Sequence, residues 1–222
     1  MQKITIVEEK FYGRLKSRKL TDRQNDLFNT LFPKVSIEHF DDIDKTKYES
    51  IFLEIGFGGG EHIAEQAFNH PNNLYIGCEP FVNGVASLLC KIEDNDIRNI
   101  KIYQNDARNI LKEIPENTLR GAYLLFPDPW PKRKHIRRRF LQIKTIETIC
   151  DKLIKGGVWR IATDHPEYQV WLKKHINLKE VQSMFDIKIF ESCNRPDIND
   201  WPKTRYEQKA TNNIIYVELA KL

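Results

Sequence analysis

Residues 51–60 read Ile51-Phe52-Leu53-Glu54-Ile55-Gly56-Phe57-Gly58-Gly59-Gly60. A short apolar run that ends in several glycines predicts a buried strand followed by a tight turn. The glycines permit a positive φ and let a ligand come close to the backbone. Because residues 61–67 then have a helical pattern, the stretch predicts a strand, a ligand-binding loop and a helix in succession.

The same alternation continues along the chain. Further apolar runs lie at residues 74–79, 100–105, 119–126 and 158–163, and helices are expected at residues 82–92, 108–113, 136–154 and 167–175. We expect Gly156 and Gly157 to end the helix at 136–154. The last strand-like runs, residues 186–190 and 213–219, have no clear helix between them. The sequence therefore predicts an α/β fold, in which a mostly parallel sheet has helices on both faces and an antiparallel C-terminal edge pair.

The chain has 222 residues, of which 41% are hydrophobic and 30% charged, as in a globular domain. We expect one α/β domain at residues 31–222, preceded by a basic, mobile arm at residues 1–30. No apolar run reaches the roughly 18 residues of a membrane span, and no secretory signal is visible, so a cytoplasmic protein without membrane contact is expected. The spacing of the four cysteines and six histidines predicts no metal site. The sequence leaves open whether the protein is a monomer or a homodimer.

Positive charge gathers in two segments, although the net charge of the chain is only +4. Residues 132–139 contain six Lys/Arg and no acid, and residues 1–23 contain seven Lys/Arg against three acids. The rest of the chain is therefore acidic. This asymmetry favours a directed surface for a polyanion. The alternative interpretation is a solvated helix start and a disordered tail.

The second basic segment follows an unusual turn, Phe126-Pro127-Asp128-Pro129-Trp130-Pro131. Its three prolines exclude a helix and predict a stiff, extended segment that leaves the fourth strand. The turn holds one carboxylate and one indole directly before the cations. Because an acid beside an aromatic plane suits a base and the cations suit phosphates, we expect contact with nucleic acid here. The Trp130 indole either stacks on the base or only packs against the protein.

Acidic side chains stand at the carboxyl ends of the predicted strands, where parallel sheets bind their ligands. Glu79 lies where an acid commonly binds a ribose diol, Asp106 is placed for an adenine edge, and Glu54 for an ammonium group. Glu61 replaces the last glycine of a dinucleotide fingerprint and disfavours a pyrophosphate at the helix start. A ligand with a ribose, an adenine and positive charge, but no phosphate, is S-adenosylmethionine.

Together these motifs resemble the bacterial tRNA (guanine-N7-)-methyltransferases. The resemblance rests on residues 54–60, 77–79, 105–107, 126–132, 137–139, 163–165 and 204–207. Cys78 and Tyr206 depart from the residues that such proteins commonly have. The resemblance implies a Rossmann-like class I methyltransferase fold with a seven-stranded sheet. It also implies methyl transfer from S-adenosylmethionine to N7 of a guanosine in the variable loop of tRNA.

The resemblance also implies roles for individual residues. The S-adenosylmethionine site would comprise Glu54, Gly56, Gly58, Glu79, Asp106 and Asp128. Contacts with the guanosine and the tRNA would come from Lys132, Lys134, His135, Arg137, Arg138, Arg139, Asp164, Thr204, Arg205, Tyr206 and Glu207. We expect Asp128 to be the catalytic residue, because a carboxylate that accepts from guanine N1–H and the 2-amino group favours the positive charge of the methylated base.

Three other functions stay open on the sequence alone. Asp128-Pro129 is similar to the start of the D/N-P-P-[YFW] motif of amino-methyltransferases acting on DNA or RNA, but Trp130 occupies the place of the second proline. A nicotinamide-dependent oxidoreductase is disfavoured by Glu61 and by the lack of a second G-x-G. A non-catalytic RNA-binding subunit is disfavoured by the acids at four strand ends.

Overall fold

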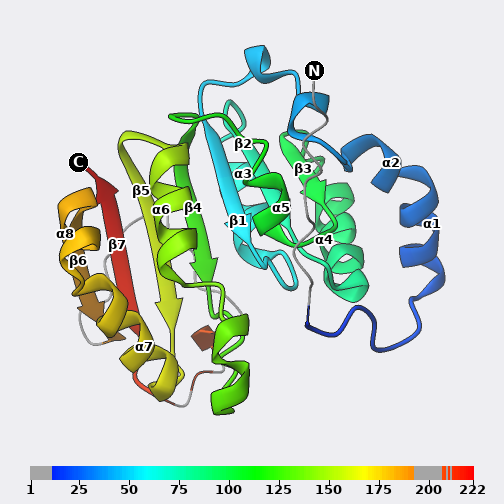
Figure 1. Ribbon diagram of the computed structural model, residues 1–222. Helices are drawn as coiled ribbons and strands as arrows, with labels where there is room; N and C mark the ends of the chain where they lie inside the picture. Colours follow the sequence, from blue (N-terminus) through cyan, green and yellow to red (C-terminus); the bar gives the residue numbers. More distant parts are fainter. Residues whose placement is uncertain (1–11, 193–206, 209, 211) are drawn as a thin grey trace, which may run out of the picture.

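The centre of the fold is a seven-stranded sheet in the order β3-β2-β1-β4-β5-β7-β6 (Figure 1). The computed structural model describes residues 12–192, 207, 208, 210 and 212–222. The strands are β1 (Ile51–Ile55), β2 (Leu74–Cys78), β3 (Ile100–Tyr103), β4 (Leu119–Leu125), β5 (Leu153–Thr163), β6 (Phe185–Glu191) and β7 (Ile215–Lys221). Strands β1 to β5 pair in parallel, whereas β7 is antiparallel to both β5 and β6. The predicted sheet, including its antiparallel C-terminal pair, is confirmed.

Helices cover both faces of this sheet. They are α1 (Asp22–Thr30), α2 (Phe32–Val35), α3 (Glu61–Asn69), α4 (Val82–Asp94), α5 (Ala107–Ile110), α6 (Ile143–Lys152), α7 (Pro166–Ile176) and α8 (Lys179–Met184), with short 3-10 turns η1 (Phe40–Asp42), η2 (Lys45–Lys47) and η3 (Arg133–Arg138). Successive strand residues point to opposite faces. Leu53 of β1 and Ile76 of β2 therefore join a core with α5 to α8, whereas Tyr75 joins a second core with α3 and α4.

The part of the predicted arm from residue 12 to residue 30 lies against the sheet domain. Thr21 caps α1 through a capping box with Gln24, and α1 packs against α4 (Figure 1). Leu27 of α1 is buried, and the Arg23 guanidinium pairs with Glu93 at 2.7 Å. The division of the chain at residue 30 stays a prediction.

The helix predicted at residues 136–154 is wrong in its extent. The basic residues form the 3-10 turn η3, and α6 begins only at Ile143. Gln142 is extended (φ −132°) and is the N-cap of this helix, with its backbone N–H donating to Thr145 Oγ1 at 2.9 Å. Gly156 and Gly157 do not end a helix, because they lie within β5. The pairing of β4 with β5 jumps between Leu153 and Val158, and Gly156 takes a φ of 72° in this irregularity.

Candidate active site

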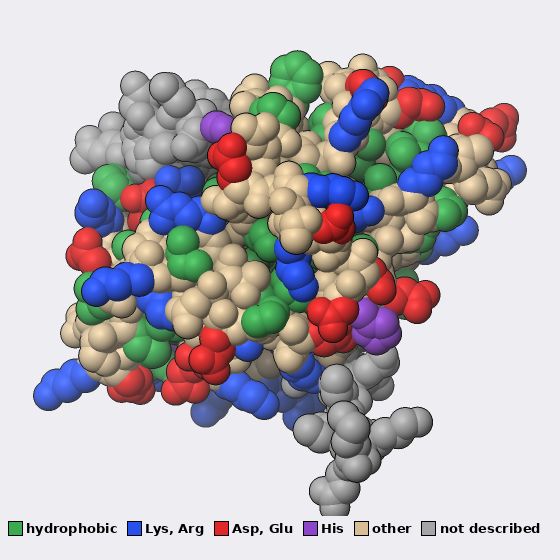
Figure 2. Space-filling model, turned by 90° about the horizontal axis from the view of Figure 1, so that it is seen from above, with side chains coloured by type: hydrophobic (Ala, Val, Ile, Leu, Met, Phe, Trp, Pro, Cys, Tyr) green, Lys and Arg blue, Asp and Glu red, His purple; other side chains and the backbone are tan. Residues whose placement is uncertain are grey.

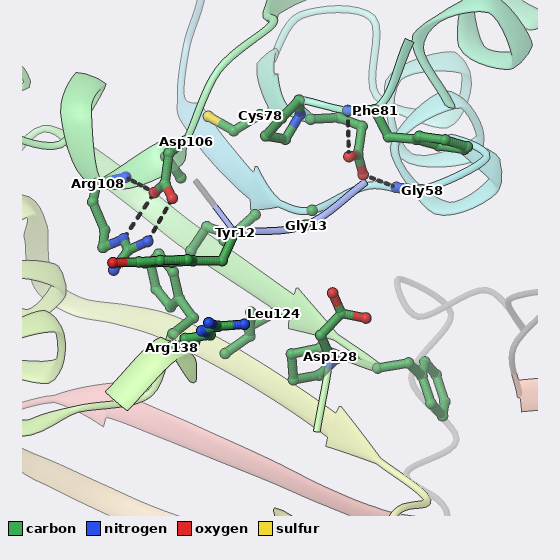
Figure 3. Close-up of a pocket in the computed structure, with 18 of the residues that line it drawn as sticks. Tyr12, Gly13, Gly58, Cys78, Phe81, Asp106, Arg108, Leu124, Asp128 and Arg138 are labelled. Atoms are coloured by element: carbon green, nitrogen blue, oxygen red, sulfur yellow. Dashed lines mark hydrogen bonds and ion pairs between the residues drawn. The ribbon is translucent and has the colours of Figure 1, made fainter. Parts of the chain in front are cut away.

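A pocket of about 430 Å³ lies at the carboxyl ends of β1 to β4 (Figure 3). Its walls come from five segments that are far apart in the sequence. They are Tyr12 to Arg14, Ile55 to Gly58, Cys78 to Phe81, Asn105 to Arg108, and the stretch from Leu124 to Trp130, with Arg138 and Phe140 beside the last. The position agrees with the rule that ligands bind where parallel strands end. The volume is within the usual range for small-molecule sites.

The glycine loop and Glu79 form one rigid wall of this pocket. Gly56, Gly58 and Gly60 have φ values of 69°, 55° and 74°, so the predicted positive φ values are confirmed. The Gly58 N–H donates to Glu79 Oε2 at 2.8 Å, and the Phe81 N–H donates to Oε1 at 2.9 Å (Figure 3). Burial raises the pKa of the Glu79 carboxyl above its ordinary value, and these two N–H groups oppose the rise. The two hydrogen bonds therefore fix the orientation of the Glu79 carboxylate.

Asp128 stands on the opposite wall, at the turn after β4, with its carboxylate toward the pocket (Figure 3). The turn is strained, because Phe126 and Trp130 have φ values of 51° and 40°. Among the described residues, no hydrogen bond or ion pair engages the Asp128 side chain. Although much of its surface is open, the pocket walls desolvate the carboxyl and raise its pKa above the ordinary value. An unsatisfied carboxylate at a strained turn is a good acceptor for a ligand.

Asp106 lines the pocket but already has a cationic partner. Its carboxylate accepts from the Arg108 backbone N–H at 3.0 Å and from Nε and Nη2 of the Arg108 guanidinium at 2.9 and 2.6 Å (Figure 3). The two side chains are only 8% and 20% exposed. Arg108 was missed by the sequence reasoning. The one available signal was its position in the sequence, two residues after the acid Asp106 at the end of a strand.

Glu54 does not line the pocket. Its carboxylate contacts His62 Nδ1 at 2.6 Å, and the two side chains are 5% and 1% exposed. The His62 ring meets the Tyr123 ring edge-on, with centroids 4.5 Å apart. Because Glu54 lies in β1 next to its last residue and His62 lies in the first turn of α3, the pair joins the two elements that flank the glycine loop. His62 was not foreseen, since a single histidine in a helix carries no specific signal.

The basic residues after the turn fall into two groups. Lys132, Lys134 and Arg137 are exposed, at the start of η3 and within it, directly after the turn that lines the pocket. The Arg138 guanidinium lines the pocket and lies over the rings of Trp130 at 5.0 Å and Tyr12 at 4.5 Å.

Trp130 also meets the His135 ring edge-on, with centroids 5.7 Å apart. Partial desolvation and, to a smaller extent, the neighbouring cations lower the pKa of His135, which favours the neutral ring. Arg139 differs from its neighbours, because its side chain is 4% exposed and its Nε donates to the Pro129 carbonyl at 2.7 Å. The Arg139 guanidinium therefore stabilises the turn instead of facing solvent.

Two further predicted residues, Asp164 and Glu207, are absent from the lining of the pocket. Asp164 follows β5, is half-buried and is absent from the pocket lining. The Glu207 carboxylate accepts from the Tyr216 hydroxyl at 2.7 Å. Thr204, Arg205 and Tyr206 lie outside the described residues. Conversely, Tyr12 and Gly13 line the pocket without having been predicted there.

Residues 48–216 match the protein family described as "Putative methyltransferase". The chain belongs to this family. The tRNA (guanine-N(7)-)-methyltransferase of Zymomonas mobilis is 40% identical to this methyltransferase over 205 residues, which cover 90% of this chain and 88% of that protein. Proteins of the same name from Erythrobacter litoralis and Caulobacter vibrioides are 38% and 37% identical, each across 88% of its length, and the matches cover 90% and 89% of this chain.

Solved structures agree on the fold. An rRNA methylase from Streptococcus thermophilus has a TM-score of 0.55 at 20% identity, covering 78% of this chain and 87% of that one. A tRNA (m1A58) methyltransferase from Aquifex aeolicus has a TM-score of 0.53 at 14% identity, covering 93% and 72%. The predicted class I methyltransferase fold is confirmed. None of the helices in the described residues combines the length and apolar character needed to cross a membrane.

Proposed function

We propose that this methyltransferase transfers a methyl group from S-adenosylmethionine to N7 of a guanine in tRNA, giving N7-methylguanosine and S-adenosylhomocysteine. The observation that carries the proposal is that one turn places Asp128 and Trp130 in the pocket directly before an exposed run of cations. The names of the relatives support the same reaction and substrate. With tRNA as substrate we expect the protein to work in the cytoplasm, and the family resemblance places the guanosine in the variable loop.

The residues of the pocket fit S-adenosylmethionine. The space beside Gly56 is open, since a Cβ built there would meet no atom within 4 Å, so a ligand can lie against the backbone. Glu79 presents an oriented carboxylate for a ribose diol, and the Asp106–Arg108 pair lies where an adenine edge is expected. A sulfonium and an ammonium group suit Glu79 and Asp128, whose carboxylates line the pocket without a cationic partner among the described residues. The bound cofactor supplies the electrophilic methyl group.

In this proposal Glu54 does not contact the cofactor itself. Because its carboxylate is buried against His62, we propose that it holds the glycine loop in place for the cofactor. This differs from the direct ammonium contact expected from the sequence. Burial is the main cause that raises the pKa of Glu79, and the Asp128 and Glu54 charges raise it further, so the three acids share one electrostatic environment that a cationic ligand would stabilise.

The chain's own contribution to methyl transfer is alignment and charge stabilisation. Guanine N7 has an in-plane lone pair and needs no general base, so holding it in line with the methyl group provides much of the rate enhancement. The ionised Asp128 carboxylate accepts from guanine N1–H and the 2-amino group, which selects guanine over adenine and favours the positive charge that develops on the ring. Trp130 offers a stacking surface beside it.

The test uses the purified protein, labelled S-adenosylmethionine and tRNA that lacks N7-methylguanosine, followed by chromatography of the nucleosides. We expect label in N7-methylguanosine. Asp128→Asn should lower the rate at saturating tRNA by about 10²-fold, whereas the matched control Asp151→Asn, at an exposed position on α6, should keep it. Full turnover in Asp128→Asn would remove this residue from the site, and label in N6-methyladenosine would favour an amino-methyltransferase.

A further inference from the structure

Residues 14–19, which we call the basic strap, are held by the first turn of α4. The Val82 N–H donates to the Leu15 carbonyl at 2.9 Å. The Asn83 side chain then clasps the strap twice: its Oδ1 accepts from the Ser17 N–H at 2.9 Å, and its Nδ2 donates to the Arg18 carbonyl at 2.9 Å. The Ser17 hydroxyl also donates to Asn83 Oδ1, at 3.4 Å. These bonds fix the backbone of the strap and leave its Lys and Arg side chains unengaged by the helix.

The strap presents its cations to solvent. Arg14, Lys16, Arg18 and Lys19 are all exposed, and within the ranges that the structure describes none of them pairs with an acid. The contrast with Arg23 is informative, since its guanidinium lies 2.7 Å from Glu93 of α4. Neighbouring cations that repel one another without acidic partners are costly to hold together, so their arrangement favours an external anion.

The strap flanks the pocket on the side opposite the turn after β4. Tyr12 and Arg14 line the pocket, and Tyr12 reaches across to the Arg138 guanidinium. Figure 1 shows the strap, in dark blue, and η3, in green, at the end of the molecule where the carboxyl ends of β1 and β4 lie. At the opposite end, Lys and Arg side chains are interspersed with Asp and Glu (Figure 2). Unpaired cations therefore stand on both sides of the pocket.

We infer that the basic strap is a second binding surface for the tRNA backbone, which contacts phosphates on the other side of the target guanine from residues 132–137. This inference rests on the proposed function of the pocket. A base that enters a pocket leaves its stack, so the backbone passes the rim of the pocket in both directions. Because Asn83 orders the strap before binding, the cations meet the phosphates at a lower entropic cost than a disordered tail would incur.

The experiment measures binding of unmodified tRNA by fluorescence anisotropy between 50 and 200 mM salt. Each lost phosphate contact lowers the slope of log affinity against log salt by about 0.7–0.9. Lys16→Gln/Arg18→Gln should therefore lower the slope by about 1.4–1.8, so the affinity lost across this salt range becomes roughly tenfold smaller than in the parent. The rate of methyl transfer at saturating tRNA should stay close to the parent's.

The matched control is Lys155→Gln/Lys179→Gln, which removes the same charge from two exposed lysines at the starts of β5 and α8. Neither lysine lines the pocket or belongs to the strap, so the control should keep the parental slope. An equal fall in the control would reduce the effect to net charge, and an unchanged slope in the strap variant would overturn the inference. If the parent binds tRNA but transfers no methyl group, the proposed reaction fails while the strap remains testable by binding.

Asn83→Ala separates the position of the cations from their number. This variant keeps every charge but removes both clasping bonds to the strap. We expect tRNA affinity to fall several-fold and the salt slope to decrease in the same direction as in Lys16→Gln/Arg18→Gln. Parental affinity and slope in Asn83→Ala, in a protein that melts at the parental temperature, would contradict the role given to the clasp.

Discussion

Replacing His62 by alanine removes the partner of a buried carboxylate at the base of the glycine loop. In the parent, His62 Nδ1 lies 2.6 Å from Glu54 Oε2, and the two side chains are 1% and 5% exposed. The structure records no other bond of the Glu54 carboxylate among the described residues. After the substitution, the folded protein holds an acid that is shielded from water without a hydrogen-bond donor.

The expected cost follows from this burial. Removing the hydrogen-bond partner of a buried carboxylate costs about 3 kcal/mol, because the remaining acceptor is left unsatisfied away from water. For a chain of 222 residues, each kcal/mol lowers the melting temperature by about 2–4 °C, so His62→Ala should melt on the order of 10 °C below the parent. Since the pair joins the end of β1 to the start of α3, the glycine loop between them should also bind S-adenosylhomocysteine more weakly.

Thermal unfolding with and without S-adenosylhomocysteine measures both effects. His62→Gln is the matched variant, because its amide can still donate to Glu54, and it should recover at least half of the lost stability. The double variant Glu54→Gln/His62→Ala completes a double-mutant cycle, in which the two costs should be strongly non-additive. A melting temperature for His62→Ala within 2 °C of the parent, or additive costs, would refute the reasoning.

Three shorter predictions concern the rest of the site. A Cβ on Gly84 would lie 2.3 Å from the Gly58 carbonyl oxygen, so Gly84→Ala should displace the glycine loop and weaken S-adenosylhomocysteine binding at least tenfold by calorimetry. Arg139→Ala should lower stability by about 2–3 kcal/mol, because it removes the donor to the Pro129 carbonyl, and should leave the salt slope of tRNA binding unchanged. Because burial raises the folded-state pKa of Asp128, ionisation costs stability as the pH rises through the interval between its unfolded and folded pKa values. Asp128→Asn should therefore melt above the parent at pH 8 in the absence of cofactor, and the difference should shrink as the pH falls.

The sequence predicted the positions of the pocket residues better than their partners. Glu79 and Asp128 lie on the pocket walls, as expected for acids that follow parallel strands, because the strand ends are fixed by the sheet. The partner of each acid depends on side chains that meet only after folding. No local sequence pattern predicts the contact of His62 with Glu54 or the contact of Arg108 with Asp106.

The same limit explains the error at residues 136–154. The apolar spacing there suits a helix, but two local features interrupt it. The Gln142 backbone is extended, and the Leu141 carbonyl accepts from the Trp171 Nε1–H at 2.7 Å. The second bond joins residues 30 positions apart, so it belongs to the packing of α7 against this segment and not to local propensity.

The basic block shows why charge alone does not define a binding surface. Arg138 and Arg139 are adjacent and chemically identical, yet one guanidinium lies between two aromatic rings at the pocket and the other is buried beneath the proline turn. The buried arginine donates to the Pro129 carbonyl next to Asp128 and so helps to maintain the strained backbone on which the catalytic carboxylate is proposed to stand. A turn with three prolines offers few N–H donors of its own, and it therefore needs a donor from elsewhere to hold its carbonyls. The positive charge in this segment is therefore divided: Arg139 stabilises the turn, and the exposed cations are the ones that we propose to contact the tRNA.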